Sequence, residues 1–275
     1  MELWSGRRLP FEPSGWLRLL RAELRVAVSQ LEDDGESLLH ALYASEQRDA
    51  CDAENILFYN VGSTCFSAST RRGLRFERTC ELPKSPRGMV EGATHYHRYW
   101  LAPRGGEFIS WQTSRTTASW EAPTLPLTGT TKPATVWLAV KRGTRVLHHE
   151  AREPIGRFGL RLRVGVPSVA TARAITLVKP ILDGVISAFH THDGSTETEV
   201  VKRLATQTDA DEAELTEHLR SSRFGVLGRR RLLHLRGSSI QWNPADDHCV
   251  ACELLIQGSD GWSISGDLFE VVARQ

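Results

Sequence analysis

Two groups of histidines have the residue types and the spacing that a metal site needs. One residue separates His95 from His97, so a strand would place both imidazoles on the same face. His190, His192 and Asp193 form the second group. Neutral imidazole and carboxylate bind Zn²⁺ or Fe²⁺, and an open position for water would make such a site hydrolytic. The structural alternative is that histidine at a helix end is favoured by the helix dipole, since no spacing rule brings the two groups together.

A basic run in the C-terminal third is a candidate contact for DNA or RNA. Arg229, Arg230 and Arg231 are consecutive, and Trp242 follows within the same stretch of chain. Guanidinium groups can contact phosphates while an indole ring stacks on a base. The formal charge of the whole chain is only +1, so binding of this kind must be local, and the alternative is a solvated loop. The absence of a glycine-rich phosphate loop and of a Gly-x-Ser-x-Gly motif disfavours nucleotide-driven and acyl-transfer enzymes.

Two short motifs resemble those of the RusA-type Holliday-junction resolvases. The segment Leu177-Val178-Lys179-Pro180-Ile181-Leu182-Asp183-Gly184-Val185 resembles the helix of that family, and Asp246-Asp247-His248-Cys249-Val250 resembles its later double-aspartate strand. The two motifs also occur in the family's order. The resemblance implies a Mg²⁺-dependent nuclease in which Lys179, Asp246 and Asp247 are catalytic residues.

The chain departs from this family at its two other acids. The positions six and four residues before Lys179, where the family has aspartates, are Arg173 and Ile175, and no acid occurs from Pro167 to Lys179. Cleavage needs several carboxylates around Mg²⁺, and an arginine would repel the ion. We therefore expect a RusA-like protein that binds nucleic acid or a protein partner and has a degenerate nuclease site.

Two other functions stay open at this point. One is a metal-dependent hydrolase that uses the histidine groups and Zn²⁺. The other is a non-catalytic scaffold or accessory protein in which the helices predicted over 196–221 bind another chain. In either alternative Asp183 would only solvate a helix face, and Asp246 and Asp247 would only introduce a strand.

The elements that must position these residues indicate an α+β fold. Apolar residues from Ile175 to Phe189 recur at spacings of three and four, which predicts a packed central helix over about 176–190. Pro180 constrains the start of this helix, which we place near Thr176. Short β-rich runs at 56–61, 74–77, 96–101, 108–111, 158–166, 249–256 and 269–272 predict an antiparallel or mixed sheet. The segment 113–133, rich in Thr, Ser and Pro, is expected to be an irregular connection.

The predicted domain organisation is a helical N-terminal segment, 1–53, and an α+β core, 54–275. The first segment would contain two helices, one beginning after Ser14 and one over Glu36–Arg48. A helical insertion over 194–237 would interrupt the core, with helices near 196–205 and 209–221.

Composition indicates a globular chain of the cytoplasm. Apolar residues make up 40% of the 275 residues, enough for a full core. The apolar run Val136–Val140 is far shorter than the roughly 20 residues that span a bilayer, and Met1–Arg8 leads into no export signal. The five cysteines are odd in number and scattered, which favours reduced thiols.

Overall fold

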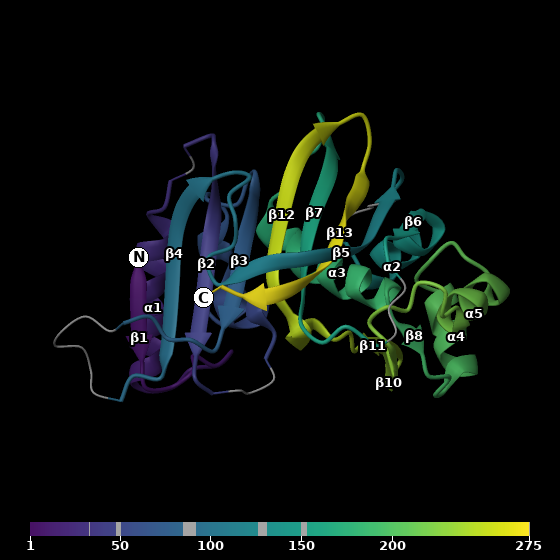
Figure 1. Ribbon diagram of the computed structural model, residues 1–275, viewed down its shortest axis with the longest axis horizontal. Coiled ribbons are helices and arrows are strands. Elements are labelled where there is room, and N and C mark those ends of the chain that lie inside the picture. Colours follow the sequence, from purple (N-terminus) through teal and green to yellow (C-terminus); the bar gives the residue numbers. More distant parts are fainter. Residues whose placement is uncertain (33, 48–50, 85–91, 126–130, 150–152, 275) are drawn as a thin grey trace.

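One large sheet organises the molecule and confirms the α+β class. A computed structural model describes residues 1–32, 34–47, 51–84, 92–125, 131–149 and 153–274. Within them nine strands form a mixed sheet (Figure 1). Their order across the sheet is β1 (Glu2–Ser5), β4 (His95–Pro103), β2 (Ser37–Ser45), β3 (Gly73–Thr79), β12 (Cys249–Ser259), β7 (Phe158–Pro167), β13 (Ser263–Ala273), β5 (Trp111–Ala122) and β6 (Thr144–Leu147).

Strand direction determines which chain ends meet at each edge of this sheet. β2 and β3 are parallel, β3 and β12 are antiparallel, and β12 and β7 are parallel. The end of β2 and the end of β3 therefore lie beside the beginning of β12. Segments nearly 200 residues apart along the chain therefore lie side by side at this end of the strands, because Tyr43 pairs with Arg78 and Glu77 pairs with Ala251.

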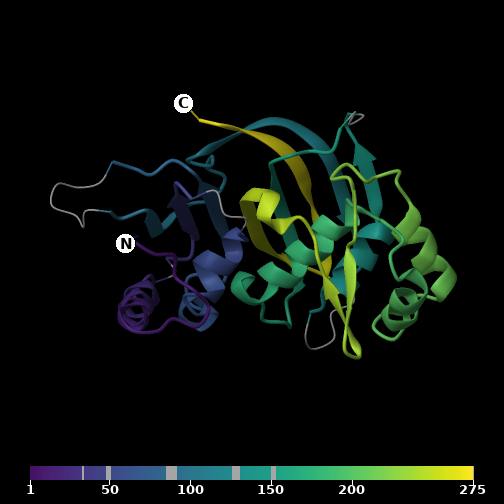
Figure 2. The same ribbon diagram turned by 90° about the horizontal axis from the view of Figure 1, so that it is seen from below.

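The helices lie on one face of the curved sheet, as Figure 2 shows. The α-helices are α1 (Trp16–Ser29), α2 (Pro133–Arg142), α3 (Ala174–Ala188), α4 (Glu197–Ala205) and α5 (Glu212–Arg220). The short helices are the π-helix η1 (Asn55–Tyr59) and the 3₁₀-helices η2 (Ser63–Phe66) and η3 (Asp246–His248). Two small sheets complete the fold, one of β8 (Thr191–His192) with β9 (Arg229–Arg230) and one of β10 (Leu233–Arg236) with β11 (Ser239–Trp242).

Helix α3 is the central packed helix that the apolar pattern predicts. It is buried on most sides because α2 crosses it closely at Gly184, where an added Cβ would lie 2.6 Å from Val136 Cβ. The helix begins at Ala174 instead of near Thr176, so Pro180 stands inside it as its seventh residue. The expected position of the proline in the first turn is therefore wrong, and α3 lacks one internal amide donor.

Four local predictions are wrong, in whole or in part, for identifiable reasons. Within the expected second helix, Glu36–Arg48, residues Ser37–Ser45 form strand β2, and Arg48 lies outside the described residues. The strand is buried on both faces, so its near-continuous apolar run matches helical spacing as well. The expected strand from Ile56 is the π-helix η1. Of the expected strand Phe108–Trp111, residues 108–110 belong to the connection before β5, which begins at Trp111. The segment expected to be irregular contains most of β5, where β-branched threonines pair with β13.

The N-terminal residues are not a helical pair, since β1 and β2 both join the main sheet beside α1. In contrast, α4 and α5 agree closely with the helices predicted inside 194–237. Asp211 is the N-cap of α5 and accepts a hydrogen bond from the amide of Glu214 (2.8 Å). Across the described residues, every helix is too short or too polar to serve as a membrane span.

Candidate functional site

A cluster of charged side chains surrounds Lys179 on the exposed edge of α3. Its ammonium Nζ lies 2.8 Å from Asp246 Oδ2, 3.0 Å from Glu54 Oε1, 3.0 Å from Asp183 Oδ1 and 3.9 Å from Asp52 Oδ2. One ammonium therefore faces four carboxylates. The cluster has an excess of negative charge that Lys179 alone does not neutralise.

Three parts of the chain supply these groups, and the sheet brings them together. Asp52 and Glu54 follow β2 and lead into η1, while Asp246 opens η3 directly before β12. The end of β2 and the start of β12 lie at the same sheet edge, for the reasons of strand direction given above. Lys179 and Asp183 are one helical turn apart on α3, so both project from the same side of that helix.

Asp52, Glu54 and Asp246 have the geometry of a cation site. Each offers one carboxylate oxygen, and these oxygens all lie within 4.8 Å of one another. Among the described residues this is the only group of three or more Asp, Glu, His or Cys side chains so arranged. Carboxylate oxygens are the ligands that Mg²⁺ and Mn²⁺ prefer, so the residues present fit such an ion.

Burial shifts the proton affinities of the cluster. Glu54 is 1% exposed, and burial raises its pKa to about 8; Lys179 opposes this shift, whereas Asp246 and Asp52 add to it. Burial likewise raises the pKa of Asp183 to about 6, against the effect of Lys179. Burial would lower the pKa of Lys179, but the neighbouring carboxylates of Glu54, Asp183 and Asp246 raise it above its ordinary value. The lysine thus stays charged, while Glu54 holds a proton near neutral pH.

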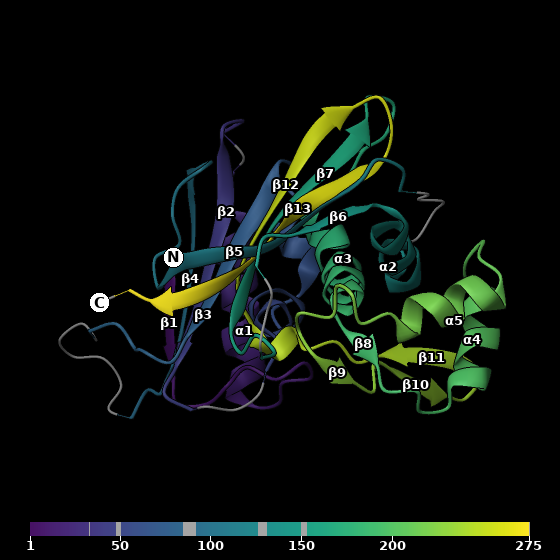
Figure 3. The same cartoon turned by 45° about the vertical axis from the view of Figure 1, so that its right-hand side comes forward.

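The cluster opens into a polar cavity of about 530 Å³. Acids from η3 and α3 line one part of it, and the strands β9 and β11 with the residues after them line another. The lining residues are Asp52, Asn55, Lys179, Asp183, Arg230, Gln241, Trp242, Asn243, Pro244, Asp246 and Asp247. A cavity of this size accommodates a mononucleotide-sized group. Figure 3 shows β9 below α3 and β10 and β11 next to α4.

The cavity contains several of the residues predicted from sequence. Lys179, Asp246 and Asp247 lie in it together, as do Arg230 and Trp242. Asp247 is outside the three-carboxylate group, and its Oδ2 lies 3.6 Å from His248 Nε2. Arg229 and Arg231 are exposed and do not line the cavity, and Arg229 donates a hydrogen bond to the carbonyl of Asp193 (2.9 Å).

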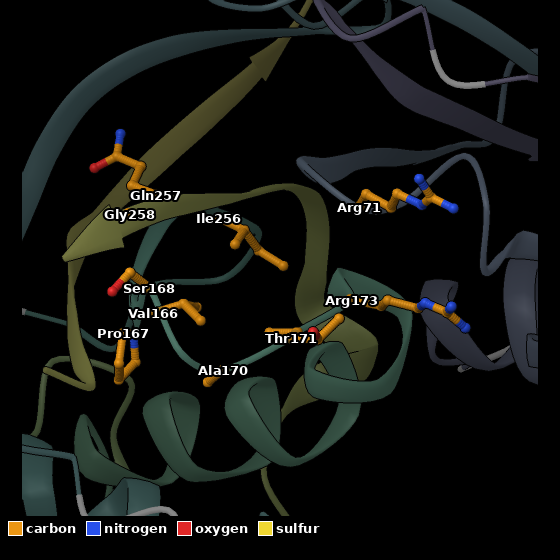
Figure 4. A pocket seen from close by; sticks show the side chains of 11 residues that line it. Arg71, Val166, Pro167, Ser168, Ala170, Thr171, Arg173, Ile256, Gln257 and Gly258 are labelled. Carbon is orange, nitrogen blue, oxygen red and sulfur yellow. The ribbon is translucent and has the colours of Figure 1, made fainter.

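Two acids of the cluster, Asp52 and Glu54, were not among the site residues predicted from the sequence. Glu54 is 125 residues before Lys179, and with Asp52 it forms the same acid-x-acid spacing as the family's missing pair. This spacing alone did not indicate a site, because the residues that face Asp52 and Glu54 are distant in the sequence. Arg173 does not take the position of these acids. It precedes α3 and lines a different cavity of about 410 Å³, which Figure 4 shows with Arg71 at one side.

The two histidine groups do not meet, so the prediction of a shared metal site is wrong. Figures 1 and 3 both place β4, which carries His95 and His97, at the opposite end of the molecule from β8. Tyr43 Oη lies 2.7 Å from His95 Nδ1, and burial, followed by the charge of His95, lowers the pKa of His97 to about 3. Among the described residues, no triad of potential metal ligands includes either histidine.

The second histidine group serves the local structure around β8 and β9. His190 Nδ1 lies 3.1 Å from the carbonyl of Gly228, and His192 Nε2 lies 3.0 Å from the carbonyl of Ser195. Asp193 accepts a hydrogen bond from the amide of Ser195 (2.8 Å). His190, His192 and Asp193 thus each have one side-chain atom with a hydrogen-bond partner in the fold, while His190 Nε2 is buried without a partner among the described residues.

Comparison with known proteins identifies no relative, since no family model, no curated protein and no solved structure matches this chain. The assignment of function therefore depends on the geometry of the site.

Proposed function

We propose that this protein is a divalent-metal-dependent phosphodiesterase that acts on nucleic acid. The observation that carries the proposal is the placement of Asp52, Glu54 and Asp246 around Lys179 at the wall of a polar cavity. The expectation of a degenerate site rested on two missing acids. Asp52 and Glu54 support the proposal, because with Asp246 they make a group of three carboxylates that could hold a divalent cation.

The residues of the cavity divide into three roles. Asp52, Glu54 and Asp246 would hold Mg²⁺ or Mn²⁺, which supplies a more acidic bound water and neutralises phosphate oxygens. Lys179 provides a permanent positive charge for the phosphate, and Asp183 holds its ammonium in place through their ion pair of 3.0 Å. Hydrolysis joins the oxygen of a water to phosphorus and releases one sugar oxygen as an alcohol.

Groups on the other side of the cavity support nucleic acid as the substrate. Arg230 offers a planar guanidinium for a neighbouring phosphate, and Trp242 offers an aromatic surface for a base. Gln241 and Asn243 add amides that can bond to base or sugar edges. The five cysteines are all unpaired, in keeping with action in the reducing cytoplasm.

Binding without cleavage is the second candidate function. It is favoured by the position of Lys179 Nζ, which contacts three carboxylates at 2.8–3.0 Å and so competes with a cation for them. In that case the protein would hold a phosphate or an acidic partner at the cavity without hydrolysing it.

Nuclease assays on the wild-type protein and two variants separate the candidates. Labelled single-stranded, duplex and branched DNA, and RNA, are incubated with Mg²⁺, Mn²⁺ or EDTA. We expect cleavage that requires the metal and that Asp246→Asn reduces by more than the roughly 100-fold cost of losing an outer-shell partner. Asp260→Asn, at an exposed position between β12 and β13, is the matched control and should cleave normally.

Two results would overturn the phosphodiesterase proposal. One is the absence of cleavage on every substrate with either metal, and the other is metal-dependent cleavage that Asp246→Asn leaves intact. Metal-independent binding of the same nucleic acids, without cleavage, would instead support the second candidate.

A further inference from the structure

Arg78, on β3, lies next to the acidic cluster without belonging to it. Its Nη1 donates a hydrogen bond to the carbonyl of Cys51 (2.8 Å) and lies 3.1 Å from Cys51 Sγ, and its Nη2 donates to the carbonyl of Asp247 (2.8 Å). One guanidinium therefore joins the backbones of two segments that are far apart in the sequence.

Both carbonyls belong to residues that are next in sequence to acids of the three-carboxylate group. Cys51 directly precedes Asp52, and Asp247 directly follows Asp246. The bond to the Cys51 carbonyl restrains the peptide that joins Cys51 to Asp52, and the bond to the Asp247 carbonyl restrains the chain one residue beyond Asp246. Together they limit the directions from which the carboxylates of Asp52 and Asp246 leave the chain. Because one guanidinium group makes both hydrogen bonds, its size limits the distance between the segment that carries Asp52 and the segment that carries Asp246.

Arg78 is itself held firmly. Its carbonyl accepts a hydrogen bond from Trp111 Nε1 (2.8 Å), and its backbone pairs with Tyr43 of β2. Along β3 its side chain follows Leu74 and Phe76, two buried residues at intervals of two, so it points toward the helical face on which the cluster lies. The anchor is thus part of the sheet and does not depend on a loop.

We propose that Arg78 is a positioning residue that sets the separation of Asp52 and Asp246 and thereby the affinity of the site for a divalent cation. This inference rests on the metal site of the proposed function. Its physical basis is the planar guanidinium, whose donors have fixed directions and reach two acceptors at once. A lysine at this position keeps the positive charge but has a single ammonium group. It cannot reproduce the two hydrogen bonds that Arg78 donates to the carbonyls of Cys51 and Asp247.

Mn²⁺ binding to the full-length chain tests the inference. The free-ion signal in electron paramagnetic resonance is titrated for wild type, Arg78→Lys and Arg78→Ala, and urea unfolding of each is measured in parallel. We expect one bound Mn²⁺ in wild type and an affinity about 10- to 100-fold lower in both variants, the range typical of a lost outer-shell partner. Arg115→Lys is the matched control, because Arg115 pairs with Glu270 on β5 and β13, outside the site.

Chemical rescue separates positioning from a general loss of stability. Methylguanidinium at millimolar concentration should restore Mn²⁺ binding to Arg78→Ala, whereas methylammonium at the same ionic strength should not. Lack of Mn²⁺ binding by the wild type would overturn the metal site, and this inference with it. Wild-type binding that persists unchanged in Arg78→Ala, or in Arg78→Lys, would overturn only the positioning role of Arg78.

Discussion

Replacing Glu54 by glutamine removes one buried charge from the site with almost no change in shape. The amide of Glu54→Gln retains an oxygen that can accept the hydrogen bond from Lys179 Nζ, which is 3.0 Å long in the wild type. The variant loses the carboxylate whose pKa burial raises to about 8. Stability should therefore respond to pH differently in the two proteins.

The direction in which stability changes with pH follows from the raised pKa of Glu54. The folded state holds the Glu54 proton more tightly than the unfolded state, so its contribution to stability is complete below pH 4.5 and is lost as the pH rises through 8. The interval from 4.5 to about 8, at roughly 1.36 kcal/mol per pKa unit, corresponds to at most about 5 kcal/mol. The Glu54→Gln variant does not lose this free energy of unfolding as the pH rises, because the amide does not ionise.

Urea unfolding between pH 5 and pH 9, followed by tryptophan fluorescence without divalent cations, measures the difference. We expect similar free energies of unfolding at pH 5 and a variant more stable than wild type at pH 9. Added Mn²⁺ should then stabilise the wild type at pH 9, because the ion binds the ionised site in the folded state, but should have little effect on the variant. Glu217→Gln, exposed on α5, is the control and should follow the wild type.

The same pH dependence in Glu54→Gln and wild type would refute the conclusion that burial holds Glu54 protonated. Stabilisation by Mn²⁺ that is undiminished in the variant would refute its assignment as a ligand. The two outcomes are independent, so the electrostatic and the metal-binding parts of the reasoning are tested separately.

Two further substitutions test the packing around α2. Burial, followed by the charge of Arg145, lowers the pKa of Lys141 to about 7 from 10.5, so this residue costs stability below pH 7 and the cost disappears as the pH rises toward 10.5. Lys141→Met should raise the free energy of unfolding at pH 6, by at most roughly 5 kcal/mol, and an equal gain at pH 10 would contradict this. Gly184→Ala should lower that free energy by about 1–3 kcal/mol, because its Cβ would lie 2.7 Å from the carbonyl oxygen of Pro133. Thermal unfolding measures this loss against Gly258→Ala, which has open space around it, and a Gly184→Ala protein as stable as that control would refute the close packing.

The spacing of residues along the chain correctly predicted the helices and the strand whose structure depends on neighbouring residues. The apolar stripe of α3 identified the central helix, and alternation identified β7, where Arg161 and Arg163 leave one face polar. The charged stretches near 196–205 and 209–221 predicted α4 and α5, whose first turns are acidic in the structure. In each case the signal lies within a few residues along the chain.

Tertiary structure decided the elements and the site that depend on distant partners. Ser37–Ser45 matches a helical stripe as well as a strand, and it is a strand because β3 and β4 pair with both of its edges. Asp52 and Glu54 belong to the site because the sheet sets the end of β2 beside the start of β12, a pairing that no local spacing encodes. The histidines had suggestive spacing but lie on separate parts of the fold. Periodicity reports which side of an element is buried, whereas strand pairing across long loops determines which side chains meet.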